Sequence, residues 1–425
     1  MVNEFLGELK KYFTKPFFLA ALICVFVFYS GIAKINSRYP FVSLLKYENL
    51  EEIYCKLVSS PVKSSSGKTY SATAQIFQCK DKRGVVSSAT GRISILIPSE
   101  MVEVYYPGKL YSQSVEKGTW FYESGGFYVF SGSVSQDFFS VKKCSYGGFK
   151  NNLSGKIAYL RSLCRLQFKR LMFAWGNGGG LLLALLCGAR EYTEDSVKDA
   201  FKNAGLSHIL ALSGMHLSMF SSIAVFFGKK IGRKKLTFII RLVVLIIFVW
   251  FAGISPSLLR ALISSMLIIF ASMFSVEQPD MLLVLCFSFL LQCVISPADL
   301  TNAGFLLSYG ALAGILLANK YFFRLYNRFC PFVIASSLGS STAAQIFTAP
   351  ISLKLFGSFC PIGIVATTFV SPLITVFIYA GLALIVLTLI FPPLCPLSKW
   401  IIEILYKMIN FVTVFFSKAP AVHLT

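Results

Sequence analysis

The stretch from residue 204 to residue 217 reads AGLSHILALSGMHL and decides how the C-terminal half of the chain must fold. It places His208, Ser213 and His216 in a region that is otherwise apolar. Polar groups at bilayer depth are tolerated only inside a helix bundle or beside water, because lipid offers no hydrogen bonds. The two histidines are about 80° away from a common line on a helix, and the intervening Ser213-Gly214 pair favours a kink. We therefore expect a broken helix within a membrane bundle.

The composition around this stretch agrees with a membrane protein. Of the 425 residues, 55% are hydrophobic and 14% are charged, whereas soluble domains carry about 25% charged residues. This excludes a disordered chain and a soluble nucleic-acid-binding module, and it argues against any soluble globular protein. Apolar runs predict spans at 205–227, 236–253, 257–274, 281–295, 301–318, 331–348, 361–391 and 400–416. The run at 361–391 is long enough for two segments or one long broken helix.

The N-terminal part of the chain has a different pattern. Residues 34–150 contain short stretches of alternating apolar and polar residues, such as 73–77, 91–97 and 126–130, separated by clusters of Gly, Pro and Ser. This pattern predicts a small antiparallel β domain of about five strands. An OB-like barrel fits that size, and a generic β-sandwich fits the pattern nearly as well.

These patterns divide the chain into four predicted parts. Residues 1–33 form a cytoplasmic stub and a membrane anchor helix, for which a cleaved signal peptide is the alternative. Residues 34–150 form the β domain, residues 151–204 form amphipathic and linker helices, and residues 205–425 form the bundle. The fold class is therefore a polytopic α-helical membrane bundle with broken helices and a small β domain.

Two basic loops predict the orientation in the membrane. Residues 228–235 hold five Lys or Arg residues, and residues 319–328 hold three. Basic loops stay in the cytoplasm, and the four spans expected between them agree with this placement. The lysines before the first apolar run also place the N-terminus in the cytoplasm. The sequence therefore predicts a multi-pass protein of the cytoplasmic (inner) membrane with an extracytoplasmic β domain.

The charge of the chain is strongly positive. Lys and Arg total 40 and Asp and Glu total 19, which gives a net charge of +21. Within 34–175 there are 20 basic and 9 acidic side chains. Such an excess attracts anionic lipid headgroups or a polyanion such as nucleic acid. The predicted helix 152–173 is basic and amphipathic, so it lies on the membrane surface or contacts DNA phosphates through Arg161, Arg165, Lys169 and Arg170.

Other polar residues interrupt the apolar runs of the bundle. The candidates for lining a polar path are His208, Ser213, Gly214, His216, Pro256, Arg260, Gly304, Ser308 and Gln345. Each taken alone is explained equally well by a packing contact between helices, or by a charged side chain that reaches the interface. Taken together in a chain with so few charges, they predict a polar seam through the bundle.

The cysteines and histidines predict neither a metal site nor a cofactor site. Eleven cysteines form no CxxC pair and only three histidines are present, so zinc ligation of the usual spacing is not expected. If the β domain faces an oxidising compartment, Cys55–Cys79 is the candidate disulfide. The glycine-rich residues 176–180 are not followed by the Lys-Ser/Thr of a phosphate-binding loop.

Several ordered motifs resemble the ComEC/Rec2 family of bacterial DNA-uptake channels. The hallmark is the stretch 204–217, and the order continues with 183–190, Ala252–Ala261 (AGISPSLLRA), Asn302–Tyr309 (NAGFLLSY) and 345–356. The resemblance covers about 181–380, and the β domain falls where the family carries an OB-like domain. Asn302 and Leu306 depart from the family pattern, which has Asp and Gln there, so no function is transferred to these two residues.

The resemblance implies a non-enzymatic channel that passes single-stranded DNA across the cytoplasmic membrane during natural transformation. Implied partners are the DNA, the bilayer, a separate DNA receptor, a nuclease and a cytoplasmic motor, with self-association left open. No H-x-H-x-D-H motif of the family's nuclease domain is present, so a nuclease is expected to be absent or supplied by another protein. The aromatic candidates for base stacking are Tyr105, Tyr106, Tyr111, Trp120, Phe121, Tyr122, Phe127 and Tyr128.

Two other functions remain open from the sequence. One is a small-solute or ion transporter with a proton relay through His208, His216 and Asp299. The other is an intramembrane enzyme that acts on a lipid-linked polymer, with His216 as the base. The transporter predicts flux of a small substrate and indifference to DNA, and the enzyme predicts turnover of a lipid substrate that is lost in His216→Ala. Oligonucleotide binding by residues 34–150 that does not depend on salt would favour either of them over a DNA channel.

Overall fold

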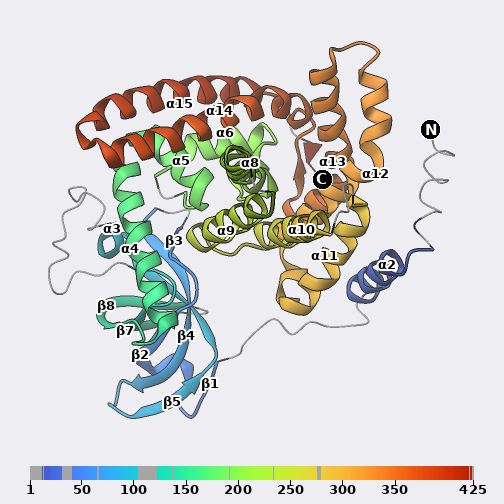
Figure 1. Ribbon diagram of the computed structural model, residues 1–425. Coiled ribbons are helices and arrows are strands. Elements are labelled where there is room, and N and C mark those ends of the chain that lie inside the picture. The colour runs from blue at the N-terminus through green and yellow to red at the C-terminus, as the bar shows by residue number, and fades with distance from the viewer. Residues whose placement is uncertain are drawn as a thin grey trace.

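The computed structural model describes residues 12, 14–30, 41–64, 67–103, 122–135, 138–190, 192–232, 234–274, 279–420 and 422–423. It contains a sheet domain and a larger helical part, joined by the long helix α4 (Leu153–Ala174). Figure 1 shows α4 running from the sheet domain into the helices. Most of the predicted cytoplasmic stub lies outside the described residues.

The sheet domain is a mixed sheet in which antiparallel pairs predominate. Its strands are β1 (Val42–Ser43), β2 (Leu50–Leu57), β3 (Val62–Lys63), β4 (Thr69–Asp81), β5 (Val86–Thr90), β6 (Arg92–Pro98), β7 (Phe127–Ser135) and β8 (Phe138–Gly148). Five of them form a closed ring in the order β4-β2-β7-β8-β6, because β6 also pairs with β4. The β6–β8 pair is parallel, so the expectation of a purely antiparallel domain was wrong. A closed ring requires β6 to return beside β8, and period-two patterning does not specify that direction.

The sheet core follows from the alternation in the sequence. Buried and exposed residues alternate along β4 and β6, and the inward side chains include Ile53, Tyr70, Ile95, Phe130 and Phe139, each at 0% exposure. The three stretches of alternating residues in the sequence lie within or overlap β4, β6 and β7. Alternation thus places one face of each strand inside the ring.

The predicted Cys55–Cys79 disulfide is absent, because both thiols are free. In the antiparallel register of β2 and β4, Cys55 lies opposite Ile76 and Cys79 lies opposite Ile53. The two cysteines are therefore diagonal neighbours and do not face each other. Burial raises the pKa of the Cys55 thiol well above its ordinary value, which keeps it in the unreactive protonated form.

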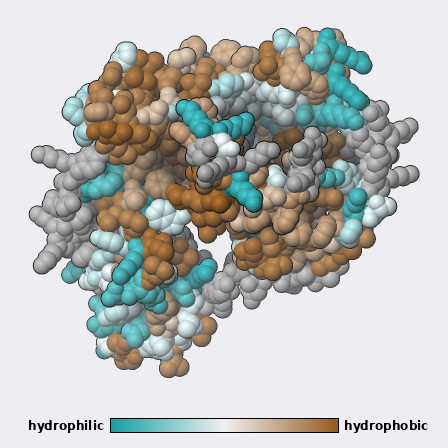
Figure 2. Space-filling view, in the orientation of Figure 1, coloured by the Kyte–Doolittle hydropathy of each residue, from teal (hydrophilic) through white to brown (hydrophobic). Residues whose placement is uncertain are grey.

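Among the described residues, the helical part contains five helices that are long and apolar enough to cross a membrane. They are α9 (Lys234–Ala252), α10 (Pro256–Met273), α12 (Ala303–Tyr326), α14 (Gly363–Ile390) and α15 (Cys395–Ser417). The other helices are α2 (Pro16–Tyr29), α5 (Gly176–Cys187), α6 (Asp195–Asn203), α7 (Ser207–Leu210), α8 (Gly214–Ile231), α11 (Met281–Ile295) and α13 (Phe332–Phe356). Large apolar side chains are exposed along many of them. Figure 2 shows broad hydrophobic surfaces over the helices, as expected of a multi-pass membrane protein.

Two apolar runs had an expected break. The run 205–227 is interrupted as expected, since α7 ends at Leu210 and α8 begins at Gly214. The run 361–391 forms the single helix α14, with Pro372 inside it, and it is not divided in two. Proline within a membrane helix is tolerated when its neighbours satisfy the freed backbone groups.

The glycine-rich residues 176–180 lie where helix α5 packs closely against its neighbours. A methyl group at Gly179 would lie 2.0 Å from the carbonyl oxygen of Met172, and one at Gly180 would lie 2.3 Å from that of Tyr192. These glycines let α5 approach its neighbours and become fully buried among α4, α14 and α15. Here glycine serves packing and not phosphate binding.

Candidate functional site

The break between α7 and α8 is held by its own polar residues. Ser213 is extended and caps α8, and its backbone N–H donates to Nδ1 of His216 at 3.3 Å. His216 is 1% exposed. Its Nε2 is buried and has no hydrogen-bond partner among the described residues. The ring therefore stabilises the break and leaves one polar atom unused.

A second break lies against the first. Gly253 has a φ of +104°, which favours glycine, and the side chain of Ser255 accepts from Leu258 N–H to cap α10. Pro256 is the first residue of α10, where its missing N–H costs nothing. Ser257 Oγ donates to the carbonyl oxygen of Leu212 at 2.7 Å, so the second motif satisfies a backbone group that the first break exposes.

Arg260 lies at the centre of this contact. A methyl group at Gly214 would lie 3.4 Å from Nη2 of Arg260, in ordinary van der Waals contact, so the guanidinium lies directly beside this glycine. Nε and Nη2 of Arg260 donate to Ser308 Oγ on α12 at 3.2 and 3.0 Å. Within the described part of the chain, no carboxylate forms an ion pair with Arg260. The cation is therefore held by neutral groups, and several of its five donors remain available.

A buried amide continues the network beside Arg260. Gln292 on α11 is fully buried; its Nε2 donates to the Pro256 carbonyl oxygen at 3.1 Å and to Asp299 Oδ2 at 2.9 Å. Tyr309, the neighbour of Ser308, donates to Gln292 Oε1 at 3.1 Å. We call the residues Gly214, Arg260, Gln292, Ser308 and Tyr309 the polar junction.

The polar junction lies where three helices begin. Gly214 opens α8, Arg260 is in the first turns of α10, and Ser308 is in the first turns of α12. The N-terminus of a helix carries a partial positive charge and unpaired N–H groups. The first turns of three helices thus lie close to Arg260, and their partial positive charge favours an anion there.

The structure brings together most of the predicted path residues. Ser213, Gly214, His216, Pro256, Arg260 and Ser308 lie in or beside the polar junction, and Gly304 is in the first turn of α12. That turn is capped by Asn302, whose side-chain oxygen accepts from Gly304 N–H at 2.8 Å, so Asn302 performs the capping that Asp would perform.

Two predicted path residues lie elsewhere. Nε2 of Gln345 on α13 would be 2.6 Å from a methyl group at Gly363, and Gly363 itself packs against Gly205. His208 on α7 is exposed, and the side-chain hydrogen bonds of Arg260 within the described residues go to Ser308. For these two residues a role in a path remains a prediction from the sequence.

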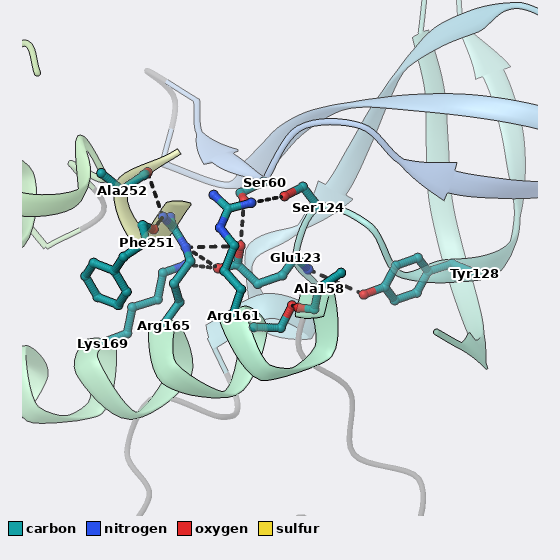
Figure 3. A network of polar contacts seen from close by, with 11 residues as sticks. Ser60, Glu123, Ser124, Tyr128, Ala158, Arg161, Arg165, Lys169, Phe251 and Ala252 are labelled. Atoms are coloured by element: carbon teal, nitrogen blue, oxygen red, sulfur yellow. Dashed lines mark hydrogen bonds and ion pairs between the residues drawn. The ribbon is translucent and has the colours of Figure 1, made fainter. Parts of the chain in front are cut away.

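The four predicted DNA-binding cations of α4 do not form an open surface. Arg165, Lys169 and Arg170 are 4–5% exposed, and Arg161 is half-buried and donates to Ser124 Oγ at 2.9 Å. Arg165 and Lys169 contact Glu123 of the sheet domain at 3.2 and 3.3 Å (Figure 3). In this arrangement the helix joins two parts of the protein and does not present cations to a phosphate backbone.

Glu123 was not singled out in the sequence, although it is the carboxylate that holds these cations. Burial alone would raise its pKa, but the charges of Arg165 and Lys169 and a hydrogen bond from Ser60 lower its pKa to about 2. The side chain is therefore ionised at neutral pH. A lone acidic residue in a weakly patterned loop gives no signal of burial, so sequence reasoning had no means to identify it.

The outer face of the sheet domain carries a different aromatic set from the one expected. Tyr105, Tyr106, Tyr111, Trp120 and Phe121 lie outside the described residues, and Tyr122 and Tyr128 are buried. Phe127 stacks on Phe77 at 5.8 Å between ring centroids, with Lys150 Nζ 5.7 Å from the centre of its ring. Tyr54 and Phe77 are each 41% exposed on β2 and β4. These rings form an accessible platform with a cation at its edge.

No group of three or more potential metal ligands occurs within the residues that the structure describes.

Arg241 was also overlooked in the sequence. It lies within α9 and donates to Ser221 Oγ on α8 at 2.5 Å. Its position in an otherwise apolar run was the available signal. This contact joins the α8–α9 hairpin away from the polar junction.

The comparisons with known proteins agree with the motifs that meet at the polar junction. The family described as Competence protein matches residues 185–425, more than half of the chain. ComE operon protein 3 of Bacillus subtilis (strain 168) is 28% identical over 204 residues, which cover 48% of this chain and 25% of that protein. Recombination protein 2 of Haemophilus influenzae is 26% identical over 210 residues, which cover 46% of this chain and 26% of that protein.

The chain spans about a quarter of the length of these two relatives. No solved structure matches it significantly. The family match begins within α5 and includes every residue of the polar junction. On this match the chain belongs to the competence protein family.

Proposed function

We propose that this protein passes single-stranded DNA across the cytoplasmic membrane in the DNA-uptake step of competence. The observation that carries the proposal is Arg260, a cation among neutral groups at the meeting point of three helix N-termini. Burying a cation without an acidic partner is costly in a membrane, so such a residue is expected to serve an anion. A DNA phosphate supplies that charge.

The geometry fits a passing backbone better than a permanent ligand. The guanidinium of Arg260 can donate in a bidentate manner to phosphate oxygens, and Ser308 holds it from the side at 3.0 Å. Gly214, at the start of α8, lies directly beside it. Successive phosphates of the strand would then bind the same Arg260 donors in turn. Conduction requires a site that both binds a passing group and releases it.

We propose that the sheet domain is OB-like and captures the strand. Support comes from the closed five-strand ring with one parallel pair and from the short helix α3 (Ser99–Glu103) between β6 and β7. The platform of Tyr54, Phe77 and Phe127 suits stacking of unpaired bases, which is sequence-tolerant. The basic character of residues 34–175 raises the local concentration of a polyanion.

We propose that the sheet domain faces outward. The basic loop between α8 and α9 belongs in the cytoplasm by the positive-inside rule, so the opposite end of α9 lies at the outer side. That end contacts the sheet domain through Arg165, which donates to the carbonyl oxygens of Phe251 and Ala252. The starts of α8, α10 and α12 then lie at the same outer end, and the polar junction forms the mouth of the path.

Other proteins complete the process in this proposal. A DNA receptor delivers the strand, a nuclease removes its complement and a cytoplasmic motor supplies the force, while this chain itself performs no catalytic step. Self-association remains an open part of the proposal. A proton relay is less well supported, since no hydrogen bond within the described part of the chain links His208 or His216 to Asp299.

The experiment compares Arg260→Ala and Arg260→Lys in a strain whose chromosomal copy is deleted. DNA import into the cytoplasm should fall by roughly a hundredfold in the alanine variant and by less in the lysine variant, which keeps the charge but loses the fork geometry. The matched control is Arg241→Ala, which removes an arginine from a neighbouring helix without touching the polar junction. Normal import with membrane-inserted Arg260→Ala protein would remove Arg260 from the path.

A further inference from the structure

The contact between the sheet domain and the helices is built on one buried carboxylate. Glu123 is 4% exposed and lies shortly before β7. Nε of Arg165 lies 3.2 Å from its carboxylate, Lys169 Nζ lies 3.3 Å from it, and Ser60 Oγ donates to it at 2.5 Å (Figure 3). Because these charges are desolvated and hydrogen-bonded, breaking the cluster by removing one partner is strongly unfavourable.

Arg165 also reaches in the opposite direction. Its Nη1 donates to the carbonyl oxygens of Phe251 and Ala252 at 2.9 and 2.8 Å. These are the last residues of α9, where helix carbonyls lack helical partners and attract cations. One guanidinium therefore binds the sheet domain and the end of a membrane helix at the same time.

A second arginine, Arg161, also lies between the sheet domain and the end of α9. Nη1 of Arg161 donates to Ser124 Oγ in the sheet domain at 2.9 Å. Its Nη2 would lie 2.9 Å from a methyl group at Gly253. Two arginines thus lie against residues 251–253; Arg165 also binds Glu123, and Arg161 also binds Ser124 of the sheet domain.

Residues 254–256 are a short link from this contact to the polar junction. Ser255 caps α10 and Pro256 is its first residue. Arg260 follows about one turn later, roughly 6 Å along the axis. Only residues 253–255 separate the end of α9 from the start of α10, so a displacement at Ala252 would reach Arg260 through the first turn of α10.

We propose that Glu123 and Arg165 are positioning residues that couple the sheet domain to Arg260 through the end of α9. They fix the start of α10, and so keep Arg260 against Gly214 and Ser308. A strand that displaces residues 122–124 of the sheet domain would then shift Arg260, which links DNA capture to opening of the path. The role of that shift in import rests on the proposed function, whereas the mechanical coupling is testable without DNA.

The test measures the reactivity of a cysteine placed under Arg260. Ser308→Cys is introduced into the full-length protein in native membranes, and maleimide modification of residue 308 is followed by peptide mass spectrometry. Glu123→Gln removes the charge that holds Arg165, and Arg165→Lys cannot donate to both carbonyls and the carboxylate at once. Each should raise the modification rate between about threefold and thirtyfold, the range of energetic coupling between distant sites. The matched control, Lys80→Met, breaks the partly exposed ion pair with Glu52 inside the sheet domain, outside the Glu123 cluster, and should leave the rate within about twofold.

The outcomes separate the coupling from the proposed function. Unchanged reactivity of residue 308 in both Glu123→Gln and Arg165→Lys would overturn the coupling, whatever happens to DNA import. A raised reactivity with normal import, measured in strains that keep Ser308, would leave the coupling intact and contradict the role of Arg260 in DNA passage. Glu123→Asp keeps the charge and should restore a rate near that of the parent. Arg165→Lys keeps a positive charge opposite Glu123. If Glu123→Gln protein does not accumulate, the reactivity of residue 308 in Arg165→Lys therefore tests the coupling alone.

Discussion

At the scale of single residues, the bundle is held by polar side chains whose partners lie on different helices. Gln292 is the clearest case, since its amide joins the Pro256 carbonyl, Asp299 and Tyr309. Removing one member leaves the others buried without partners, and each such group costs about 1–3 kcal/mol. The network therefore specifies how α10, α11 and α12 meet.

Replacement of this amide should be costly. Gln292→Leu is expected to lower the stability of the protein in detergent by roughly 2–4 kcal/mol, because the Pro256 carbonyl and Asp299 lose a donor and Tyr309 keeps only its contact with Ser288. Tyr309→Phe, which removes only one hydroxyl, should cost about 1 kcal/mol. Thermal unfolding in the same detergent measures both. Equal stabilities of the parent and Gln292→Leu would contradict the network.

The charge state of Glu123 predicts a pH dependence. Its pKa of about 2 is below the ordinary value of 4.5, so its stabilising effect is complete above pH 4.5 and is lost as the pH falls towards 2. The stability difference between the parent and Glu123→Gln should therefore be largest at neutral pH and shrink below pH 4.5. Unfolding of both proteins from pH 7 to pH 2.5 measures it, with Glu52→Gln, which removes an exposed ion pair, as the control. A difference independent of pH would refute the ionised state.

The sequence identified polar residues better than it identified their partners. Arg260, Ser308 and Gly214 stood out because each interrupts an apolar run, and the structure places them in contact. Hydropathy does not say which polar groups meet, so Gln345 was grouped with them although it packs against Gly363. Glu123 was missed because a carboxylate in a polar segment looks like a solvated one.

At the scale of secondary-structure elements, breaks and close packing follow from local chemistry. The Ser213-Gly214 pair predicted the interruption before α8, since serine caps a helix and glycine permits a close neighbour. Pro372 did not divide α14, because contacts with other helices in the bundle outweigh its local preference. Tertiary contacts of this kind are invisible in the sequence of one segment.

The glycines of α5 provide the test at this scale. Gly179→Ala would place a methyl group 2.0 Å from the Met172 carbonyl oxygen, and a backbone atom cannot move away cheaply. We expect a loss of about 1–3 kcal/mol, measured as a lower unfolding temperature in detergent. Gly310→Ala is the control, since the atom nearest to its methyl would be the tip of Ile351 at 3.2 Å, and its other neighbours would lie at 3.7 Å or more. A similar small effect in both variants would argue against close packing of α5.

At the scale of the whole molecule, the account requires the sheet domain and the basic loops to lie on opposite sides of the membrane. The composition and the spacing of apolar runs were enough to predict a membrane bundle with a β domain, because both depend on hydropathy alone. The closed ring with a parallel pair and the attachment through α4 were not predictable, since they depend on contacts between residues far apart in the chain.

Cysteine labelling tests this orientation in intact cells. Lys82→Cys, in the turn between β4 and β5, should react with an impermeant maleimide from outside. Arg328→Cys, beyond the end of α12, should react only after the membrane is permeabilised. Native cysteines are distinguished by mapping the modified peptides. Labelling of both positions from the same side would contradict the proposed orientation.

The central claim is that DNA passes the polar junction, and photocrosslinking tests it most directly. Cells take up a single strand that carries photoreactive groups along its backbone and a bulky end that stalls it in the membrane. After irradiation, the account predicts crosslinked peptides from residues 207–216, 254–260 and 303–309, together with peptides from the sheet domain. Crosslinks confined to the sheet domain, with none in these three segments of a stalled import complex, would contradict it.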